Sequence, residues 1–269
     1  MSSMSHQDKM KILGFEEWEL TNIMELQKKP SFQVVETLFE MKETVISFGA
    51  AKFDNILKGG LRTGGITEIV GESGCGKTQL CLQLCLSLQI SQPNQGVLYI
   101  CTESVFPTAR LAQLCNLSPL ASSKCSDNIF ITHCYEFADL KHTLETQTGF
   151  IQKKVGMLII DSIAGIFRNT YPDDKYVQRA HDMRYLAHYL HDISIKHNLA
   201  VICSNQVTSA MTHSDKSVPA LGLSWANLVT NRLVLSKSPF NQRTLTVEFS
   251  PYMPTGVGIQ FDILPGGIG

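Results

Sequence analysis

Long hydrophobic runs are missing from this sequence. No stretch reaches the roughly 18 consecutive apolar residues that a membrane-spanning helix needs, and residues 1–19 lack the apolar centre of a secretory signal. We therefore expect a protein that has no membrane partner and stays inside the cell.

An excess of charge of one sign is also missing. The chain has 23 Lys and Arg against 24 Asp and Glu, which gives a net charge of −1 at pH 7, and it has no strongly basic run. A nucleic-acid partner would have to bind a local basic patch, because the charge of the whole chain provides no attraction.

Zinc-type cysteine spacing is absent too. The eight cysteines include no Cys-x-x-Cys pair. Several of them lie in apolar segments, which favours reduced and buried thiols over disulfides or a metal site. His188 and His191 are one helical turn apart, but with no third ligand nearby we interpret them as part of a solvated helix face.

The 269 residues divide into three segments in our interpretation. Residues 1–29 hold a short N-terminal helical segment, an amphipathic helix that Pro30 ends. Residues 30–45 show neither a helix cap nor a tight turn, which indicates a linker. Residues 46–269 are long enough to form one domain with its own core.

Residues 46–269 have the alternating pattern of an α/β protein. Strand-like runs occur at 65–70, 96–102, 128–133, 156–162 and 199–205, and helical stretches begin near Lys77, Phe106, Glu136 and Val177. This alternation is typical of a largely parallel sheet flanked by helices. The runs at 231–237, 243–250 and 258–264 are separated by short turns, which favours antiparallel strands toward the C-terminus.

The stretch VGESGCGKTQL at 70–80 contains the pattern Gly-x-x-x-x-Gly-Lys-Thr between a strand run and a helical stretch. Its glycines let successive N–H groups face an anion at a helix N-terminus. Lys77 then reaches the β- and γ-phosphates, and Thr78 offers its hydroxyl to Mg²⁺. The sequence therefore predicts a nucleoside triphosphate site whose residues are Gly71, Glu72, Ser73, Gly74, Cys75, Gly76, Lys77, Thr78 and Gln79.

Further polar residues end buried strand runs, where the carboxyl ends of parallel strands meet. Asp161 would hold the metal through water, although an aspartate capping a turn is the alternative. Glu103 would orient and deprotonate the attacking water, unless it caps a helix. Asn205 and Gln206 end another run, and an amide there would sense the γ-phosphate.

Five motifs, in this order, resemble the ATPase core of the RecA/RadA recombinase family. They are GGLRTGGITEIVGESGCGKTQLCLQL, YICTESVFPTARLAQL, MLIIDSIAGIFR, LAVICSNQVT and PALGLSWANLVTNRLVL. Within the family the chain is similar to the eukaryotic recombinase paralogues. The resemblance implies a RecA-type P-loop ATPase core with ATP and Mg²⁺ as cofactors. It also implies site roles: Lys77, Glu103 and Gln206 are catalytic, Thr78 and Asp161 hold Mg²⁺, and Arg110 lies against the adenine.

Two segments match the family's DNA-facing loops, residues 168–178 and 207–221. The resemblance implies that Arg168, Lys175, Arg179 and Lys216 contact DNA phosphates. The alternative is that these cations only solvate loops. The second segment is poor in glycine, and Gly74 stands where the main recombinases carry a bulkier residue, which argues against strand exchange. The family's N-terminal domain is reduced to some thirty residues here, so we do not expect duplex binding through it.

The linker resembles the family's polymerisation motif at SFQVVETLF. Phe32 matches the aromatic anchor, whereas Val35 replaces an alanine. Such a strand adds to the edge of a neighbour's sheet and produces head-to-tail assembly. The larger Val35 favours a different pocket, so we infer another recombinase paralogue as the partner. Packing of the linker on its own chain is the alternative.

The expected function is that of an ATP-binding recombinase paralogue in homologous-recombination repair of DNA breaks. It would work in a hetero-complex with another recombinase paralogue, bind single-stranded or branched DNA, and support the main recombinase filament. ATP would act as a switch with slow hydrolysis, and the location would be the nucleus and also the cytoplasm. The alternative is a self-assembling DNA-dependent motor ATPase or a true strand-exchange recombinase. A signalling kinase ranks last, because no acceptor-binding lid is evident.

Overall fold

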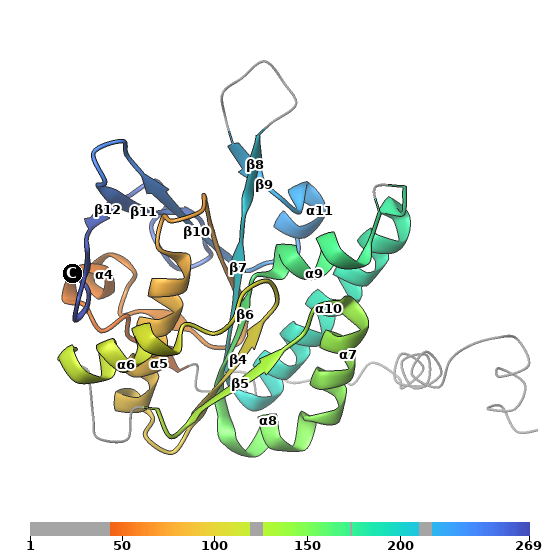
Figure 1. The fold of residues 1–269 in the computed structure, drawn as a ribbon, viewed down its shortest axis with the longest axis horizontal. Coiled ribbons are helices and arrows are strands. Elements are labelled where there is room, and N and C mark those ends of the chain that lie inside the picture. Colours follow the sequence, from red (N-terminus) through yellow and green to blue (C-terminus); the bar gives the residue numbers. More distant parts are fainter. Residues whose placement is uncertain (1–43, 119–125, 173, 210–216) are drawn as a thin grey trace, which may run out of the picture. The chain divides into compact units, whose positions relative to one another are not determined.

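The computed structural model describes residues 44–118, 126–172, 174–209 and 217–269 (Figure 1). These residues belong to one compact unit, Glu43–Gly269. The predicted helical segment 1–29 and the partner residues Phe32 and Val35 lie outside the described part. Among the helices that are described, none combines the length and the apolar character that crossing a membrane requires.

The domain begins slightly earlier than the predicted boundary at residue 46. Thr44 N donates to Thr63 Oγ1 at 2.9 Å, and Thr63 N donates to the Thr44 carbonyl oxygen at 3.0 Å. Strand β1 (Val45–Ile46) then pairs antiparallel with β2 (Leu61–Arg62). The last two residues of the predicted linker are therefore part of the folded domain.

An eight-stranded sheet with the order β12-β11-β10-β3-β7-β6-β4-β5 forms the centre of the domain. Neighbours from β10 to β5 pair in parallel, and β11 and β12 pair antiparallel at the other edge. The predicted α/β fold with antiparallel strands toward the C-terminus is confirmed. The strands are β3 (Ile66–Gly71), β4 (Gly96–Cys101), β5 (Ile129–His133), β6 (Val155–Asp161), β7 (Ala200–Asn205), β10 (Asn231–Lys237), β11 (Arg243–Phe249) and β12 (Gly258–Phe261).

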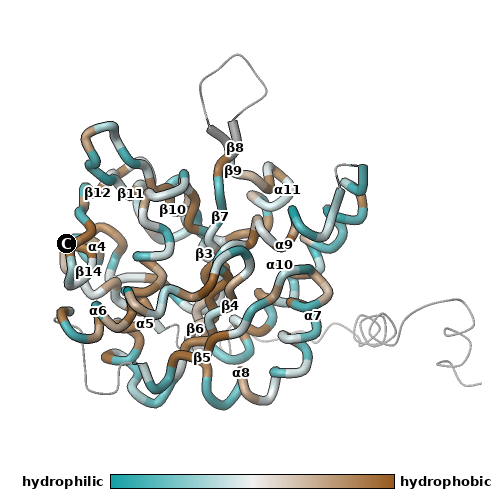
Figure 2. The backbone as a smooth tube through the Cα atoms, viewed as in Figure 1, coloured by the Kyte–Doolittle hydropathy of each residue, from teal (hydrophilic) through white to brown (hydrophobic). Residues whose placement is uncertain are grey.

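Helices cover both faces of this sheet. Val97 and Tyr99 of β4 pack into one hydrophobic core, and the alternate residues Leu98 and Ile100 pack into the other, as the two-residue period of a strand requires. Because both faces are covered, the central strands β3, β4 and β7 are buried along their whole length, and most of their residues are apolar (Figure 2). The helices are α4 (Ala51–Ile56), α5 (Lys77–Ser91), α6 (Thr108–Leu117), α7 (Phe137–Thr146), α8 (Thr148–Lys154), α9 (Ile163–Thr170), α10 (Tyr176–His197) and α11 (Gly222–Ala226).

Helix α5, which follows the phosphate loop, is enclosed on nearly every side. Residues 80–89 are all buried, including Gln83. Gln83 Nε2 donates to the Phe48 carbonyl oxygen at 2.9 Å, and its Oε1 accepts from Ile268 N at 2.5 Å. These bonds hold α5 against the C-terminal hairpin of β13 (Ile263–Leu264) and β14 (Gly267–Ile268). The helix that begins at the phosphate loop therefore has a fixed position.

The prediction of reduced, buried cysteines is correct for most of the described cysteines and wrong for one. The free and buried ones are Cys75, Cys81, Cys85, Cys101, Cys134 and Cys203. Cys115, on α6, is instead disulfide-bonded. It is only partly buried, so it lacks the apolar enclosure on which the prediction was based.

Candidate nucleotide-binding site

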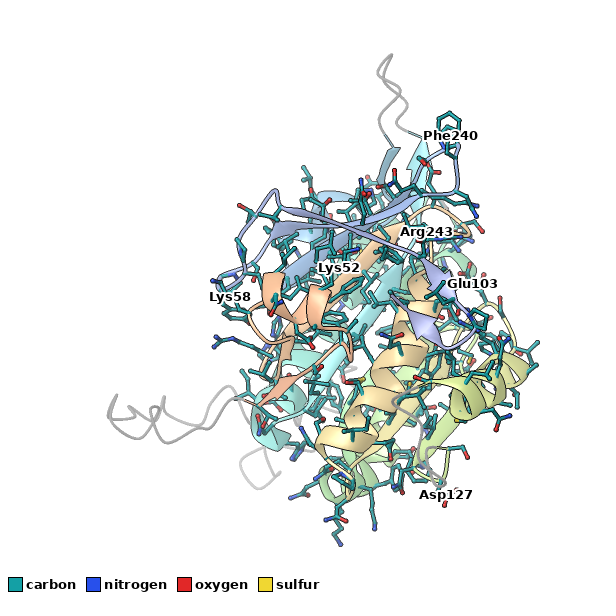
Figure 3. All side chains as sticks on the ribbon, turned by 90° about the vertical axis from the view of Figure 1, so that its left-hand side faces the viewer. Lys52, Lys58, Glu103, Asp127, Phe240 and Arg243 are labelled. Atoms are coloured by element: carbon teal, nitrogen blue, oxygen red, sulfur yellow. The ribbon has the colours of Figure 1, made fainter. Side chains whose placement is uncertain are left out.

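A cavity of about 570 Å³ lies at the carboxyl ends of the parallel strands. Its volume is within the range of roughly 300 to 1,000 Å³ that is usual for small-molecule sites. Glu103, labelled in Figure 3, lines this cavity together with Ile263 of the C-terminal hairpin. Of the predicted residues, the cavity brings together Ser73, Gly74, Gly76, Lys77, Thr78, Gln79, Glu103, Arg110, Asp161 and Gln206.

The glycines of the phosphate loop are needed for two different reasons. Gly74 and Gly76 have φ angles of 76° and 115°, which side chains disfavour. Gly71 is required by space, since a Cβ there would lie 2.4 Å from the Leu235 carbonyl oxygen and 2.6 Å from Cys75 Sγ. Cys75 thus packs beneath the loop as a buried side chain, outside the cavity lining.

Lys77 is the first residue of α5, at the positive end of the helix dipole. Its Nζ donates to the carbonyl oxygens of Gly71 at 2.7 Å and Glu72 at 2.9 Å. The ammonium group therefore lies across its own loop. A loop with two positive-φ glycines, a lysine and a helix N-terminus fits the phosphates of a nucleoside triphosphate.

Asp161 accepts hydrogen bonds from side chains on three sides. Thr78 Oγ1 and Tyr99 Oη donate to its Oδ2 at 2.8 Å and 2.7 Å, and Ser204 Oγ donates to its Oδ1. A hydroxyl and a carboxylate so close together match the oxygen ligands that Mg²⁺ prefers. Thr78 and Asp161 would hold the ion here, Asp161 through water.

Tyr99 and Ser204 are site residues that the sequence analysis missed. Both lie within strand runs that were interpreted only as core, and an isolated hydroxyl in an otherwise apolar run was the available signal. Burial raises the pKa of Tyr99 well above its usual value, with the charge of Asp161 adding to the effect. The phenol therefore stays protonated and keeps donating to the carboxylate. Burial likewise raises the pKa of the neighbouring Cys101 thiol to about 12, so this cysteine is not a nucleophile.

Glu103 and Gln206 are in direct contact just beyond the C-terminal ends of β4 and β7. Gln206 Nε2 donates to Glu103 Oε2 at 2.7 Å, and Ser162 Oγ donates to the same oxygen at 2.6 Å. Arg168 Nη1 donates to Glu103 Oε1 at 2.7 Å, while its Nη2 donates to Gln206 Oε1 at 2.9 Å. The predicted water-activating residue and the predicted phosphate sensor thus share one arginine.

Asn205 does not face this cavity, contrary to the expectation that either amide would sense a phosphate. The residue is fully buried, and its Nδ2 donates to Glu68 Oε1 at 2.6 Å. Successive side chains of a strand point to opposite faces, so only Gln206 is directed toward the cavity.

Arg110 is held by the C-terminal hairpin. Its Nε donates to Gln79 Oε1 at 2.7 Å, and its Nη2 and Nη1 donate to the carbonyl oxygens of Leu264 at 2.7 Å and Pro265 at 2.9 Å. These bonds orient the planar guanidinium at the edge of the cavity. Its contact with an adenine stays a prediction.

The predicted DNA-binding residues are found in several different settings. Arg168 lies in the last turn of α9, Lys175 is exposed just before α10, and Arg179 is partly buried with Nη2 3.4 Å from the Ala220 carbonyl oxygen. Lys216 lies outside the described residues. The ends of the 207–221 segment form a hairpin in which β8 (Val207–Ser209) pairs with β9 (Ser217–Pro219) beyond the end of β7 (Figure 1).

Comparison with protein families connects this site to a known group. A family model described as Rad51 matches residues 40–269. The chain belongs to the Rad51 family. Members of the Rad51/RecA family bind ATP and usually use Mg²⁺, which agrees with the residues gathered in the cavity.

Individual relatives of the Rad51-family chain have names from DNA repair. DNA repair protein XRCC3 of Bos taurus is 32% identical over 238 residues, which cover 78% of this chain and 70% of the relative. DNA repair protein Rad51 homolog of Drosophila melanogaster is 32% identical over 257 residues, covering 88% and 74%. DNA repair protein rhp57 of Schizosaccharomyces pombe is 29% identical over 264 residues, covering 78% and 75%.

The predicted RecA/RadA family membership is therefore confirmed, and so is the resemblance to a recombinase paralogue. From the motifs GITEIVG, YICTESVFPTARL and ALGLSWAN, we also predict a similarity to X-ray-repair cross-complementing protein three. That similarity agrees with matches to XRCC3 from cattle, mouse and Arabidopsis thaliana at 32%, 34% and 30% identity.

Proposed function

We propose that this protein is an ATP-binding recombinase paralogue of homologous-recombination DNA repair. It acts in a hetero-complex with another recombinase paralogue, binds single-stranded or branched DNA, and supports the main recombinase filament in the nucleus. The observation that carries this proposal is the cavity that joins the phosphate loop, the Thr78–Asp161 pair and the Glu103–Gln206 pair. The DNA-repair names of the relatives support the biological role.

ATP binding is the first part of the proposal. Lys77 and the N-terminus of α5 attract the β- and γ-phosphates, Thr78 and Asp161 hold Mg²⁺, and Arg110 bounds the site of the base. Lys77→Ala removes the only loop cation and is expected to abolish ATP binding, measured by calorimetry with Mg²⁺ present. Lys153→Ala removes an exposed cation on α8 and should leave the affinity unchanged. Equal affinity of Lys77→Ala and the unsubstituted chain would contradict the proposed site.

Slow hydrolysis is the second part. Glu103 is the group that would orient and deprotonate an attacking water. Its two carboxylate oxygens already accept hydrogen bonds from Ser162, Gln206 and Arg168. A carboxylate whose oxygens already accept these hydrogen bonds deprotonates water slowly until one of the donor groups moves away. This arrangement favours nucleotide as a conformational switch over rapid turnover.

The hetero-complex is the third part. Within the described residues, the edge strand β5 pairs with β4 alone. Its Ile131 side chain is 43% exposed, and Tyr135 just beyond the strand is 58% exposed. An open edge with exposed apolar side chains can accept a strand that carries an aromatic anchor. We therefore assign β5 as the acceptor for a partner's linker, while Phe32 and Val35 of this chain insert into another subunit.

The nuclear location is also part of the proposal and follows from the repair role. Fluorescence microscopy of the tagged full chain in cells with induced DNA breaks tests it directly. We expect nuclear signal that gathers at the breaks. Signal that remains outside the nucleus would contradict this part and leave the nucleotide site unaffected.

A further inference from the structure

Arg168 connects the hydrolytic residues with the segment proposed to face DNA. It lies in the last turn of α9, directly before the connection to α10 that contains Lys175. Its guanidinium donates to Glu103 and Gln206, which both line the nucleotide cavity. The side chain of Arg168 is 54% exposed, whereas that of Glu103 is 25% exposed. Solvent and charged ligands can therefore reach the arginine without entering the cavity.

Arg168 uses one donor on each of its two terminal nitrogens. Nη1 is engaged by the Glu103 carboxylate and Nη2 by the Gln206 amide oxygen, at 2.7 Å and 2.9 Å. A phosphate group binds an arginine through this same pair of nitrogens. A phosphate that binds bidentately to Nη1 and Nη2 therefore takes the place of the Glu103 carboxylate and the Gln206 amide oxygen.

Removal of Arg168 would change Glu103 in a specific way. Glu103 Oε2 would keep its bonds from Ser162 and Gln206, while Oε1 would lose the donor that Arg168 provides. A carboxylate oxygen that loses its donor is free to accept a proton from water. The backbone of α9 would stay in place, because the neighbouring Ile166 and Phe167 are fully buried.

We propose that Arg168 is a positioning residue that couples DNA binding to ATP hydrolysis by exchanging Glu103 and Gln206 for a DNA phosphate. Without DNA, it holds Glu103 and Gln206 together and keeps Glu103 from acting on water. A phosphodiester of single-stranded DNA competes for the guanidinium and releases both residues. This inference rests on the proposed function, since it requires DNA and ATP as ligands.

A double-mutant cycle on DNA affinity tests the exchange without relying on turnover. The affinity of the nucleotide-free full chain for a fluorescent single-stranded oligonucleotide is measured by anisotropy. Glu103→Ala should tighten binding by about fivefold, the equivalent of a partly exposed ion pair, because Arg168 no longer has to leave its partner. Arg168→Met should weaken binding, and in the Arg168→Met background the Glu103→Ala change should have no effect. Arg184→Met, which removes an exposed cation from α10, controls for the loss of one charge.

Steady-state ATP turnover gives the second readout. Arg168→Met should raise the rate of ATP turnover measured without DNA. The ratio of the rates with and without DNA should fall close to one, and the KM for ATP should stay unchanged. Arg168→Lys should keep part of the stimulation, since lysine retains the charge but lacks the fork. Arg184→Met should behave as the unsubstituted chain.

The outcomes separate this inference from the proposed function. If Glu103→Ala increases the DNA affinity equally in the unsubstituted chain and in Arg168→Met, the increase is a general charge effect, and the proposed exchange is overturned. A lower ATP affinity in Arg168→Met with unchanged DNA affinity would assign the arginine to the γ-phosphate and overturn the exchange too. Absence of DNA binding by the unsubstituted chain would overturn both the DNA part of the proposed function and this inference, while ATP binding that depends on Lys77 would still stand.

Discussion

Glu68 and Arg232 form a buried ion pair inside the central sheet, between β3, which leads into the phosphate loop, and β10. Arg232 Nε on β10 donates to Glu68 Oε2 on β3 at 2.6 Å, and the two side chains are 5% and 0% exposed. Asn205 on β7 donates to the other oxygen of Glu68 at 2.6 Å. One carboxylate therefore joins three neighbouring strands, and two of these lead directly to the phosphate loop and to Gln206.

Removal of the arginine should destabilise the domain strongly. In Arg232→Met the Glu68 carboxylate stays buried with only Asn205 as a donor, and an uncompensated buried charge costs about 3 to 5 kcal/mol. In the double variant Glu68→Leu/Arg232→Met no charge remains to be compensated. We expect that variant to regain most of the lost free energy of unfolding, since apolar replacements of buried pairs are often close to neutral.

Urea unfolding of the full chain at neutral pH, followed by far-ultraviolet circular dichroism, measures both variants. Arg184→Met is the matched control and should change the free energy of unfolding by no more than about 0.5 kcal/mol, because its side chain is exposed. A loss below about 1 kcal/mol in Arg232→Met, the size of a surface pair, would refute the reasoning. A double variant as unstable as Arg232→Met would refute it as well.

The same pair predicts a pH dependence. Burial raises the pKa of Glu68 above its ordinary value of 4.5, although Arg232 and the Asn205 hydrogen bond act in the opposite direction. The folded protein therefore binds this proton more tightly than the unfolded chain does. The resulting stability is present below pH 4.5 and is lost as the pH rises through the folded-state pKa. We therefore measure the free energy of unfolding as a function of pH across the acidic range. In Glu68→Gln, the part of this free energy that decreases with rising pH should be absent. The same pH dependence in Glu68→Gln and the unsubstituted chain would contradict this prediction.

Three further substitutions test other parts of the domain. Gly76→Ala should lower the free energy of unfolding by about 1 to 3 kcal/mol, because a side chain is strained at the φ of 115° of this residue. Gly149→Ala is the control and should cause no such loss, because a Cβ at Gly149 meets only open space. Similar losses in the two variants would contradict this prediction. Tyr99→Phe removes a donor from a carboxylate and should lower the free energy of unfolding by about 1.5 to 3 kcal/mol in urea, so a neutral result would show that the bond contributes nothing. Ile131→Lys should prevent the hetero-complex in size-exclusion chromatography by placing a charge on the β5 edge. Ile195→Lys, at a comparably exposed site on α10, should not, and equal behaviour of the two would exclude β5 as the acceptor.

The buried strands of the sheet were predictable because each is a short run rich in apolar residues. The phosphate loop was predictable for the same reason, since Lys77 and Thr78 follow such a run at fixed spacing. Asp161 could be assigned to the metal from its place at the end of β6. Its donors could not, because Tyr99 and Ser204 come from strands that become neighbours of β6 only in the folded sheet.

The sequence did not predict helix α9, and this omission hid the contact of Arg168. The turn from β6 into α9 is very short, with Ser162 as the N-cap that accepts from Gly165 N at 3.3 Å. The family resemblance had placed the segment from Arg168 onward in a DNA-facing loop. The structure shows that its guanidinium donates to Glu103, a residue 65 positions earlier, and no local pattern encodes such a pairing.

Side-chain direction at strand ends was the other limit of the sequence. By their position alone Asn205 and Gln206 were equivalent candidates, because both end the same run, and only the family resemblance selected Gln206. The strand period directs Asn205 into the Glu68–Arg232 pair and Gln206 toward the cavity. The register that decides between them depends on the parallel pairing of β7 with β3 and β6, which is a property of the whole sheet.

The central claim is that this Rad51-family chain is an ATP-binding paralogue that assembles with a different recombinase paralogue. Light scattering gives the solution mass of the purified full chain with ATP and Mg²⁺, first alone and then mixed with a second recombinase paralogue. The account predicts a small species alone and a discrete hetero-complex in the mixture. Growth of the chain alone into rings or filaments on addition of ATP would contradict it and would favour a self-assembling motor ATPase.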